Sequence, residues 1–203
     1  MGNVAVDEPD RLRAHVYALL AHLLARPPDA GLLALVAPLR GDDTLLGRAL
    51  TALGKAASDI AERAAEREYS ALFIGVVRGE LVPYASYYRT GFLNERPLAR
   101  VRIDMQALGI ARAPGVPEPE DHIAALCEVM AGLILGTFGA PADLGHQQDF
   151  FDRHLAPWAD RFFADLEAAE AAVLYRPVGT IGRVFLDIEA QAFALASTTQ
   201  EMT

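Results

Sequence analysis

A short acidic segment, residues 118–122, reads Glu-Pro-Glu-Asp-His and is the part of the chain best suited to recognising a cationic ligand. Carboxylates bind guanidinium groups through paired hydrogen bonds, so a cluster of them favours an arginine-bearing partner. Asp121 and Glu128 are seven residues apart, which places both on one stripe if the segment is helical. The alternative is an acidic first turn of a helix, where carboxylates stabilise the positive end of the helix dipole without any partner.

A second segment gathers aromatic side chains just after a proline. Tyr84, Tyr87 and Tyr88 are three of the six tyrosines in the chain, and they follow Pro83 directly. Tyrosine offers an apolar ring with a polar tip and is enriched where a surface binds a partner. The segment therefore indicates either one wall of a peptide-binding groove or an aromatic corner that is packed only for stability.

A third segment, residues 147–166, spaces large apolar side chains at intervals of three and four. Phe151, Leu155, Trp158 and Phe162 would share one helical face, which is typical of a helix that faces a core. We interpret this segment as structural rather than as a binding site.

The sequence patterns of common catalytic and metal sites are absent. There is no Gly-x-x-x-x-Gly-Lys-Ser/Thr loop, no Gly-x-Ser-x-Gly nucleophile motif and no His-Glu-x-x-His zinc motif. Cys127 is the only cysteine, so the chain cannot form an internal disulfide. These observations predict a protein that is not an enzyme and that holds neither a metal ion nor a cofactor.

The distribution of charge argues against nucleic acid as a partner. The 203-residue chain has 18 basic and 27 acidic residues, a net charge of −9. Residues 117–170 contain 11 acidic and 2 basic residues, so this segment alone accounts for the whole excess. An acidic surface repels polyanions and attracts cations. No stretch predicts a membrane span or a secretory leader, so we expect a cytoplasmic protein without an integral membrane segment.

Helical periodicity extends through nearly the whole chain and predicts an all-α fold. We expect a compact bundle of about seven to nine helices, because the alternation and turn signals of β-hairpins are absent. The expected helices include one over 10–25, a long one over 57–78 and one over 118–136 that would carry the acidic segment.

Domain organisation is predicted to be simple. Residues 1–203 form one expected domain, which could divide into two lobes hinged near 109–118. The clearest linker signal lies in that stretch, where Ala113 to Pro117 reads Ala-Pro-Gly-Val-Pro.

The chain resembles the TorD/DmsD/NarJ family of redox-enzyme maturation chaperones. Four motifs carry the resemblance, in the family's order and spacing: Tyr69-x-x-Leu72-Phe73, Pro83-Tyr84-x-Ser86-x-Tyr88, Glu118-Pro119-x-Asp121-His122 and His154-Leu155-x-Pro157-Trp158-x-x-x-Phe162. The family often has Pro-Pro-Tyr before the tyrosine-rich helix, whereas this chain reads Val-Pro-Tyr at residues 82–84. Residues 90–98 are similar to the branch associated with formate dehydrogenases.

The resemblance implies a chaperone that binds the twin-arginine signal peptide of a molybdopterin enzyme in the cytoplasm. Such a chaperone holds its client until the cofactor is inserted and then allows export through the Tat pathway. The family also includes swapped dimers, so a homodimer is compatible with the resemblance. The positions that match the family's peptide-binding residues are Leu72, Phe73, Pro83, Tyr84, Pro119, Asp121 and His122.

These interpretations combine into one hypothesis about binding. Asp121, together with Glu118, Glu120 or Glu128, would receive the two arginines of the peptide. His122 would orient Asp121 or contact the peptide backbone. The apolar part of the peptide would lie in a groove, in the manner of helix-in-groove recognition. The residues that would line this groove are Leu72, Phe73, Tyr84, Tyr87 and Tyr88.

Three other classes remain open from the residues alone. A TetR-like regulator is also all-helical, but residues 1–60 contain 7 acidic and 6 basic residues, which is a poor match to a DNA-binding N-terminus. A helical hydrolase could use Asp121, His122 and Glu128, although adjacent helical residues diverge by about 100°. A non-catalytic helical interaction protein is the third.

Overall fold

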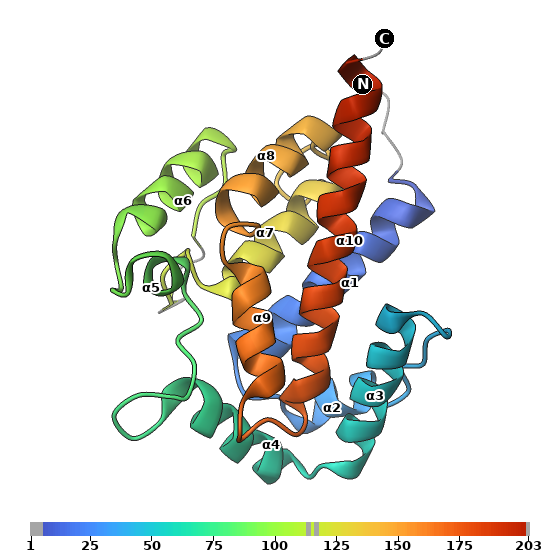
Figure 1. The fold of residues 1–203 in the computed structure, drawn as a ribbon, viewed down its shortest axis with the longest axis vertical. Coiled ribbons are helices and arrows are strands. Elements are labelled where there is room, and N and C mark those ends of the chain that lie inside the picture. Colours follow the sequence, from blue (N-terminus) through green and yellow to red (C-terminus); the bar gives the residue numbers. More distant parts are fainter. Residues whose placement is uncertain (1–5, 113–114, 116–117, 202–203) are drawn as a thin grey trace. The chain divides into compact units, whose positions relative to one another are not determined.

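The computed structural model describes residues 6–112, 115 and 118–201. This part of the chain contains ten α-helices, one π-helical turn and no β-strand (Figure 1). The elements in chain order are α1 (Glu8–Ala25), α2 (Ala30–Val36), α3 (Leu45–Asp59), α4 (Glu62–Tyr69), the π-helical turn η1 (Ser70–Ile74), α5 (Ala85–Thr90), α6 (Arg96–Ala107), α7 (Ile123–Leu135), α8 (Leu144–His154), α9 (Ala159–Ala168) and α10 (Tyr175–Glu201). The prediction of an all-α fold is confirmed, with one helix more than the expected range.

The helix predicted over 57–78 is wrong in its extent. α3 continues to Asp59, and the extended backbone of Ile60 and Ala61 separates it from α4. After η1 the chain reverses at Gly75, whose φ of 62° lies in the left-handed region that glycine tolerates. The apolar spacing continues across both interruptions, so periodicity alone could not reveal them.

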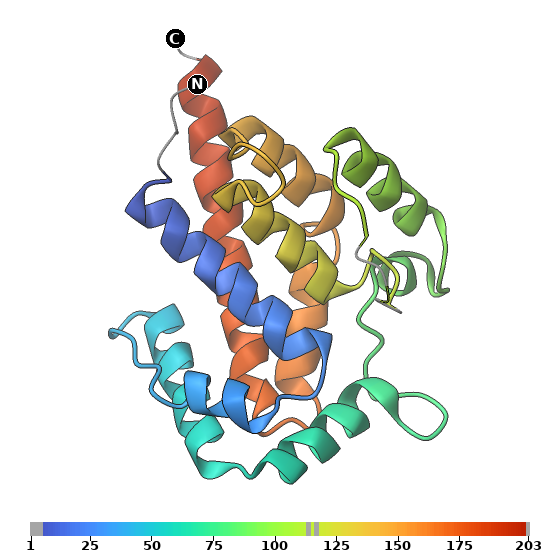
Figure 2. The same cartoon turned by 180° about the vertical axis from the view of Figure 1, so that it is seen from behind.

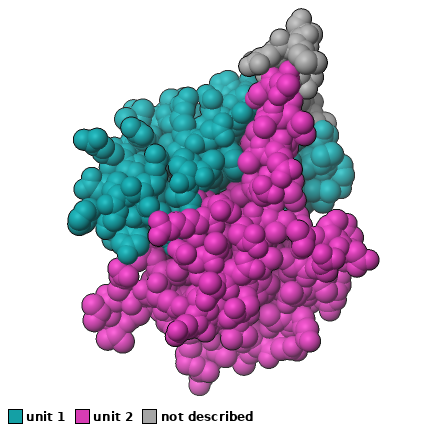
Figure 3. Space-filling model, in the orientation of Figure 1, with its two compact units in different colours: residues 1–25, 84–158 teal, residues 26–83, 159–203 magenta. Residues whose placement is uncertain are grey.

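The chain divides into two compact units, each assembled from two separate stretches of sequence (Figure 3). Unit 1 comprises the described residues of 1–25 and 84–158, and unit 2 comprises those of 26–83 and 159–203. Unit 1 therefore contains α1 and α5 to α8, while unit 2 contains α2 to α4, η1, α9 and α10. The hinge expected near 109–118 stays a prediction, and residues 113, 114, 116 and 117 of its linker lie outside the described residues.

The core of unit 1 is built on α1 and α7, which lie side by side (Figure 2). α7 is apolar on nearly every side, and ten of its 13 residues are buried. α1 adds Tyr17, Leu20 and Leu24 to the same core. Full burial of one large apolar side chain contributes about 1.5–3 kcal/mol, so hydrophobic packing holds α7 in place. α8 packs on α7, and α6 contacts both α5 and α8.

Unit 2 is organised around α10, the longest helix, which packs against α9 and α3 (Figure 1). Two glycines let α10 approach α9 closely. A Cβ at Gly179 would lie 2.5 Å from the backbone nitrogen of Glu167, and a Cβ at Gly182 would lie 2.2 Å from the ring of Phe163. Neither helix could keep its present position if these residues carried side chains.

The Gly179→Ala variant is expected to lower the free energy of unfolding by about 1–3 kcal/mol, because the new methyl group meets backbone atoms of α9 that cannot rotate away. The matched control is Gly145→Ala in α8, where the nearest atom to a new Cβ is 3.5 Å away. Alanine favours helices over glycine by up to about 1 kcal/mol, so the control should be neutral or stabilising. Urea denaturation of both variants measures these changes. A denaturation midpoint of Gly179→Ala equal to that of the wild type would contradict the close approach of α10 to α9.

Two glutamates hold the connection between α9 and α10 in unit 2. The Glu68 carboxylate accepts hydrogen bonds from the backbone N–H groups of Val173 (2.8 Å), Leu174 (3.1 Å) and Tyr175 (2.8 Å). Glu80 accepts from the backbone N–H groups at residues 170 (2.6 Å) and 171 (3.2 Å). Glu68 thus satisfies N–H groups at the start of α10, which have no partner within the helix itself.

Candidate functional site

The acidic segment forms a turn before α7 rather than the first turn of that helix. The backbone N–H of His122 donates to the carbonyl of Pro119 at 3.1 Å, and the helix begins at Ile123. His122 is the N-cap, since its Nδ1 accepts a hydrogen bond from the backbone N–H of Ala124 at 3.1 Å. The predicted helix start near residue 118 is therefore wrong, because a histidine cap terminates the turn four residues later.

Asp121 does not lie free on this turn but caps the start of α5. Its carboxylate is buried, with 1% of the residue exposed, and accepts from the backbone N–H of Ser86 at 2.8 Å. Its backbone carbonyl accepts from the N–H of Ala85 at 3.0 Å. The N-cap residue of α5, Tyr84, offers no side-chain acceptor, so Asp121 supplies the acceptor from a distant part of the sequence.

Four of the predicted site residues meet at this point of unit 1. Tyr84 and His122 form an isolated antiparallel β-bridge, and their rings lie edge to face with centroids 5.0 Å apart. The Tyr84 hydroxyl donates to the Glu118 carboxylate. With the Asp121 cap, these contacts bind the acidic turn to the first residues of α5.

Glu120 already holds a guanidinium group from the same unit. Its carboxylate accepts from Nε of Arg102 on α6 at 2.9 Å. The Glu120 side chain is 13% exposed and that of Arg102 is 51% exposed. An ion pair this close to solvent contributes about 0.2–1 kcal/mol, so a second guanidinium could replace Arg102 at low cost. Pro119, between the two glutamates, is half-buried.

Glu128 stands apart from this group. It is exposed on α7, and among the described residues its carboxylate has no hydrogen bond or ion pair. The predicted stripe from Asp121 to Glu128 is wrong, because Asp121 precedes the helix.

The two tyrosines within α5 form an aromatic group with Trp158. Tyr87 and Tyr88 are half-buried, with ring centroids 6.1 Å apart. The Tyr88 ring lies 5.4 Å from that of Trp158, whose indole N–H donates to the carbonyl of His154 at 2.7 Å. Trp158 is buried, as the structural interpretation of residues 147–166 predicts.

Three predicted site residues belong to unit 2. Leu72 and Pro83 are buried and Phe73 is half-buried. The Phe73 ring makes edge-to-face contacts with Tyr69 and Tyr175, at centroid distances of 4.9 Å and 5.4 Å. These contacts give Phe73 a packing role within its own unit.

His122 is expected to make the stability of the protein depend on pH. Burial lowers its pKa to about 4, against a smaller raising effect of Glu118. The unfolded chain, with a histidine pKa of about 6.5, therefore binds a proton before the folded protein does, and the stabilisation present above pH 6.5 is lost as pH falls towards 4. The free energy of unfolding that is lost over this pH range amounts to about 3 kcal/mol.

The His122→Asn variant separates this effect from other acid-sensitive groups, because asparagine can cap α7 but does not titrate. The free energy of unfolding of the wild type should fall by about 2–3 kcal/mol more than that of the variant between pH 7 and pH 4.5. Denaturation curves at the two pH values measure this, and parallel losses in both proteins would show that His122 is not responsible.

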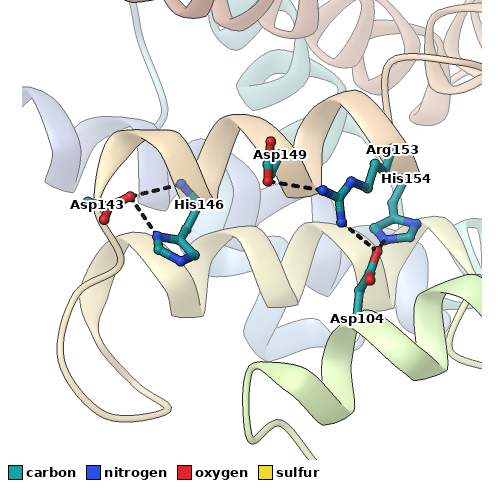
Figure 4. Close-up of polar contacts among 6 residues, drawn as sticks. All are labelled: Asp104, Asp143, His146, Asp149, Arg153 and His154. Atoms are coloured by element: carbon teal, nitrogen blue, oxygen red, sulfur yellow. Dashed lines mark hydrogen bonds and ion pairs between the residues drawn. The ribbon is translucent and has the colours of Figure 1, made fainter.

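One polar cluster escaped the sequence analysis. His154 Nε2 lies 2.8 Å from Oδ2 of Asp104, which joins α8 to α6, and Arg153 reaches both Asp104 (3.5 Å) and Asp149 (3.0 Å) (Figure 4). Burial lowers the pKa of His154, while the hydrogen bond to Asp104 raises it to a smaller extent. His154 belongs to the His-Leu-x-Pro-Trp motif, but its partner Asp104 lies 50 residues earlier in the chain. No local sequence pattern therefore indicates that the two side chains form a pair.

Two further findings concern metals and membranes. Within the described part of the chain, no group of three or more His, Cys, Asp or Glu side chains could hold a metal ion. Burial raises the pKa of the Cys127 thiol to about 12, so this cysteine is a neutral core side chain. None of the helices in the described residues is long and apolar enough to cross a membrane.

Comparison with known proteins gives consistent relatives. The TorD chaperone of Vibrio cholerae serotype O1 (strain O395) is 29% identical over 126 residues, which are 59% of this chain and 57% of the relative. The TorD chaperone of Photobacterium profundum is 34% identical over 70 residues, 34% of this chain and 32% of the relative. The chain thus spans little more than half the length of the first relative and about a third of the second. These relatives are named as chaperones.

A solved structure supports the fold. A crystal structure from Archaeoglobus fulgidus, described as a redox enzyme maturation protein, matches with a TM-score of 0.60 and 22% identity. The match covers 87% of this chain and 94% of that chain.

The family model described as nitrate reductase delta subunit matches residues 39–164, which is more than half of the chain. The matched region includes the acidic turn, the α5 segment and the aromatic residues of α8 and α9. The chain belongs to this TorD-like family of nitrate reductase delta subunit proteins.

Proposed function

We propose that this chain is a redox-enzyme maturation chaperone that binds the twin-arginine signal peptide of a molybdopterin oxidoreductase precursor. Membership of the TorD-like family and the names of the relatives support the chaperone role. The observation that carries the peptide specificity is the acidic turn before α7. There Glu118 and Glu120, two residues apart, are each bound to a single donor near the surface.

The two glutamates are the groups that receive the arginines. Glu120 is paired with Arg102, so it already accepts a guanidinium in a geometry that a client arginine can reproduce. Glu118 accepts from a tyrosine hydroxyl, a single neutral donor, whereas a client guanidinium would offer it a positive charge and paired N–H donors. The client's two guanidinium groups therefore replace one internal arginine and one hydroxyl.

Asp121 acts as a positioning residue in this proposal. Its carboxylate is buried and bound to the N–H of Ser86, so contact with a client would leave that N–H without an acceptor. The residue instead holds the acidic turn against α5, which carries Tyr87 and Tyr88. These two rings are half-buried, and in this proposal they provide apolar surface for the peptide. Leu72, Phe73 and Pro83 enter the proposal through the family resemblance.

The client and the compartment are the finer parts of the proposal. The family resemblance of residues 90–98 favours a formate dehydrogenase as the client. The chaperone would hold this precursor in the cytoplasm until its molybdopterin cofactor is inserted, before Tat export.

Titration calorimetry with a synthetic twin-arginine leader of a formate dehydrogenase tests the binding step. The Glu118→Gln/Glu120→Gln double variant should bind at least about tenfold more weakly than the wild type, because both acceptors lose their charge. The control is Glu66→Gln on α4, where an exposed glutamate is neutralised in unit 2. Equal affinity of the double variant and the wild type would contradict the proposal that the two glutamates receive the arginines.

A further inference from the structure

Unit 1 contains a cavity of about 370 Å³ that is lined by residues of α5, α6 and α8 and by Pro157. Arginines from three different helices line it: Arg89 from α5, Arg100 from α6 and Arg153 from α8. The other lining residues are Ile103, Asp104, Asp152, His154 and Pro157. A volume of this size falls within the range of small-molecule sites.

Two of the three arginines have no partner among the described residues. Across the described residues, the guanidinium groups of Arg89 and Arg100 make no hydrogen bond and no ion pair. Arg153, in contrast, is held between Asp149 and Asp104 (Figure 4). Arg89 and Arg100 are exposed, so they keep their hydration until a ligand arrives. Guanidinium groups without a partner that share one cavity are suited to an anion with several oxygens.

The acids in the cavity wall do not cancel this charge. Asp104 is occupied by His154 (2.8 Å) and Arg153 (3.5 Å), which leaves Asp152 as the carboxylate of the lining without a partner among the described residues. The surrounding segment is also basic, since residues 89–112 contain five arginines and two acids, a net charge of +3. The other part of the lining, Asp152 to Pro157, belongs to the acidic segment 117–170, and the whole lining has three arginines and two aspartates, a net charge of +1.

We propose that this cavity binds a small multivalent oxyanion, held by Arg89 and Arg100 with Arg153 as a third lining arginine. Planar guanidinium groups form paired hydrogen bonds with phosphate or carboxylate oxygens. Ile103 and Pro157 add apolar surface beside them, which can cover the carbon skeleton of an organic anion. The site is separate from the acidic turn and does not depend on signal-peptide binding.

Calorimetry with pyrophosphate and with citrate tests the site and distinguishes its phosphate and carboxylate sources. At least one probe should bind the wild type, and the Arg89→Gln/Arg100→Gln double variant should weaken that binding by about tenfold or more. The control is Arg96→Gln at the start of α6, an exposed arginine that does not line the cavity. It lowers the local charge in the same region but should change the dissociation constant less than about twofold.

A variant that is expected to bind more tightly provides a test that a loss of folding could not imitate. Asp152→Asn removes the unpartnered carboxylate from the lining and should tighten binding of the same probe by about two- to fivefold. The proposal is overturned if neither probe binds, or if Arg96→Gln weakens binding as much as the double variant. Weaker binding by Asp152→Asn would also contradict it.

Discussion

The Glu68→Ala variant is expected to lose about 3–5 kcal/mol of its free energy of unfolding. The Glu68 carboxylate accepts hydrogen bonds from three consecutive backbone N–H groups at the start of α10. Leu174 and Tyr175 are fully buried, so water cannot replace the carboxylate as an acceptor. Each buried donor left without an acceptor costs about 1–3 kcal/mol.

Two further substitutions show whether these hydrogen bonds are the cause. Glu68→Gln keeps one carbonyl oxygen as an acceptor but removes the negative charge near the N-terminus of α10, so it should lose about half as much stability. Glu66→Ala, two residues earlier on the exposed side of α4, should change stability by less than about 0.5 kcal/mol. Urea denaturation measures all three variants. A Glu68→Ala protein as stable as Glu66→Ala would refute the proposed anchoring of α10.

The second large effect is expected at Asp121, where protein stability and peptide binding should fall together. Asp121→Ala leaves the buried N–H of Ser86 without an acceptor and should cost about 2–3 kcal/mol of stability. The same variant should also bind the signal peptide at least about tenfold more weakly, because the acidic turn is no longer fixed to α5.

Asp121→Asn distinguishes a positioning role from direct contact with the client. Asparagine retains a side-chain oxygen that can accept from Ser86, so stability should fall by no more than about 1 kcal/mol. If Asp121 only positions the turn, the dissociation constant for the peptide stays within about threefold of the wild type. If Asp121 instead pairs with a client arginine, the loss of charge weakens binding as much as alanine does. Urea denaturation of Asp121→Ala and Asp121→Asn gives the change in stability, and calorimetry gives the change in the dissociation constant.

The helices could be predicted wherever their signals are local. Asp29 directly follows Pro27-Pro28, the signal that ends α1, and caps α2 by accepting from the backbone N–H of Leu32 at 2.8 Å. Gly136 ends α7 in the left-handed conformation, as its place after the apolar run indicates. Proline, capping residues and terminal glycine act on their own neighbourhood, so one sequence is enough to find them.

The contacts that build the candidate site could not be predicted in the same way. Asp121 caps a helix 35 residues earlier in the chain, and Glu68 reaches N–H groups more than 100 residues later. A buried carboxylate needs a hydrogen-bond donor, so the need could be predicted from the residue type. Which N–H groups supply it depends on tertiary packing. The acidic segment was predicted to begin a helix and instead forms a turn before α7, because the capping role of His122 is not visible in the spacing.

The most direct test of the chaperone proposal compares two leader peptides that differ only in their basic pair. One carries the twin arginines of a molybdoenzyme leader, and the other carries two lysines at the same positions. Lysine keeps the charge but cannot form the paired hydrogen bonds of a guanidinium. We predict that this protein binds the arginine peptide about 5- to 50-fold more tightly, and that the Glu118→Gln/Glu120→Gln variant loses this preference. Equal affinity of the wild type for both peptides would contradict recognition of the twin arginines.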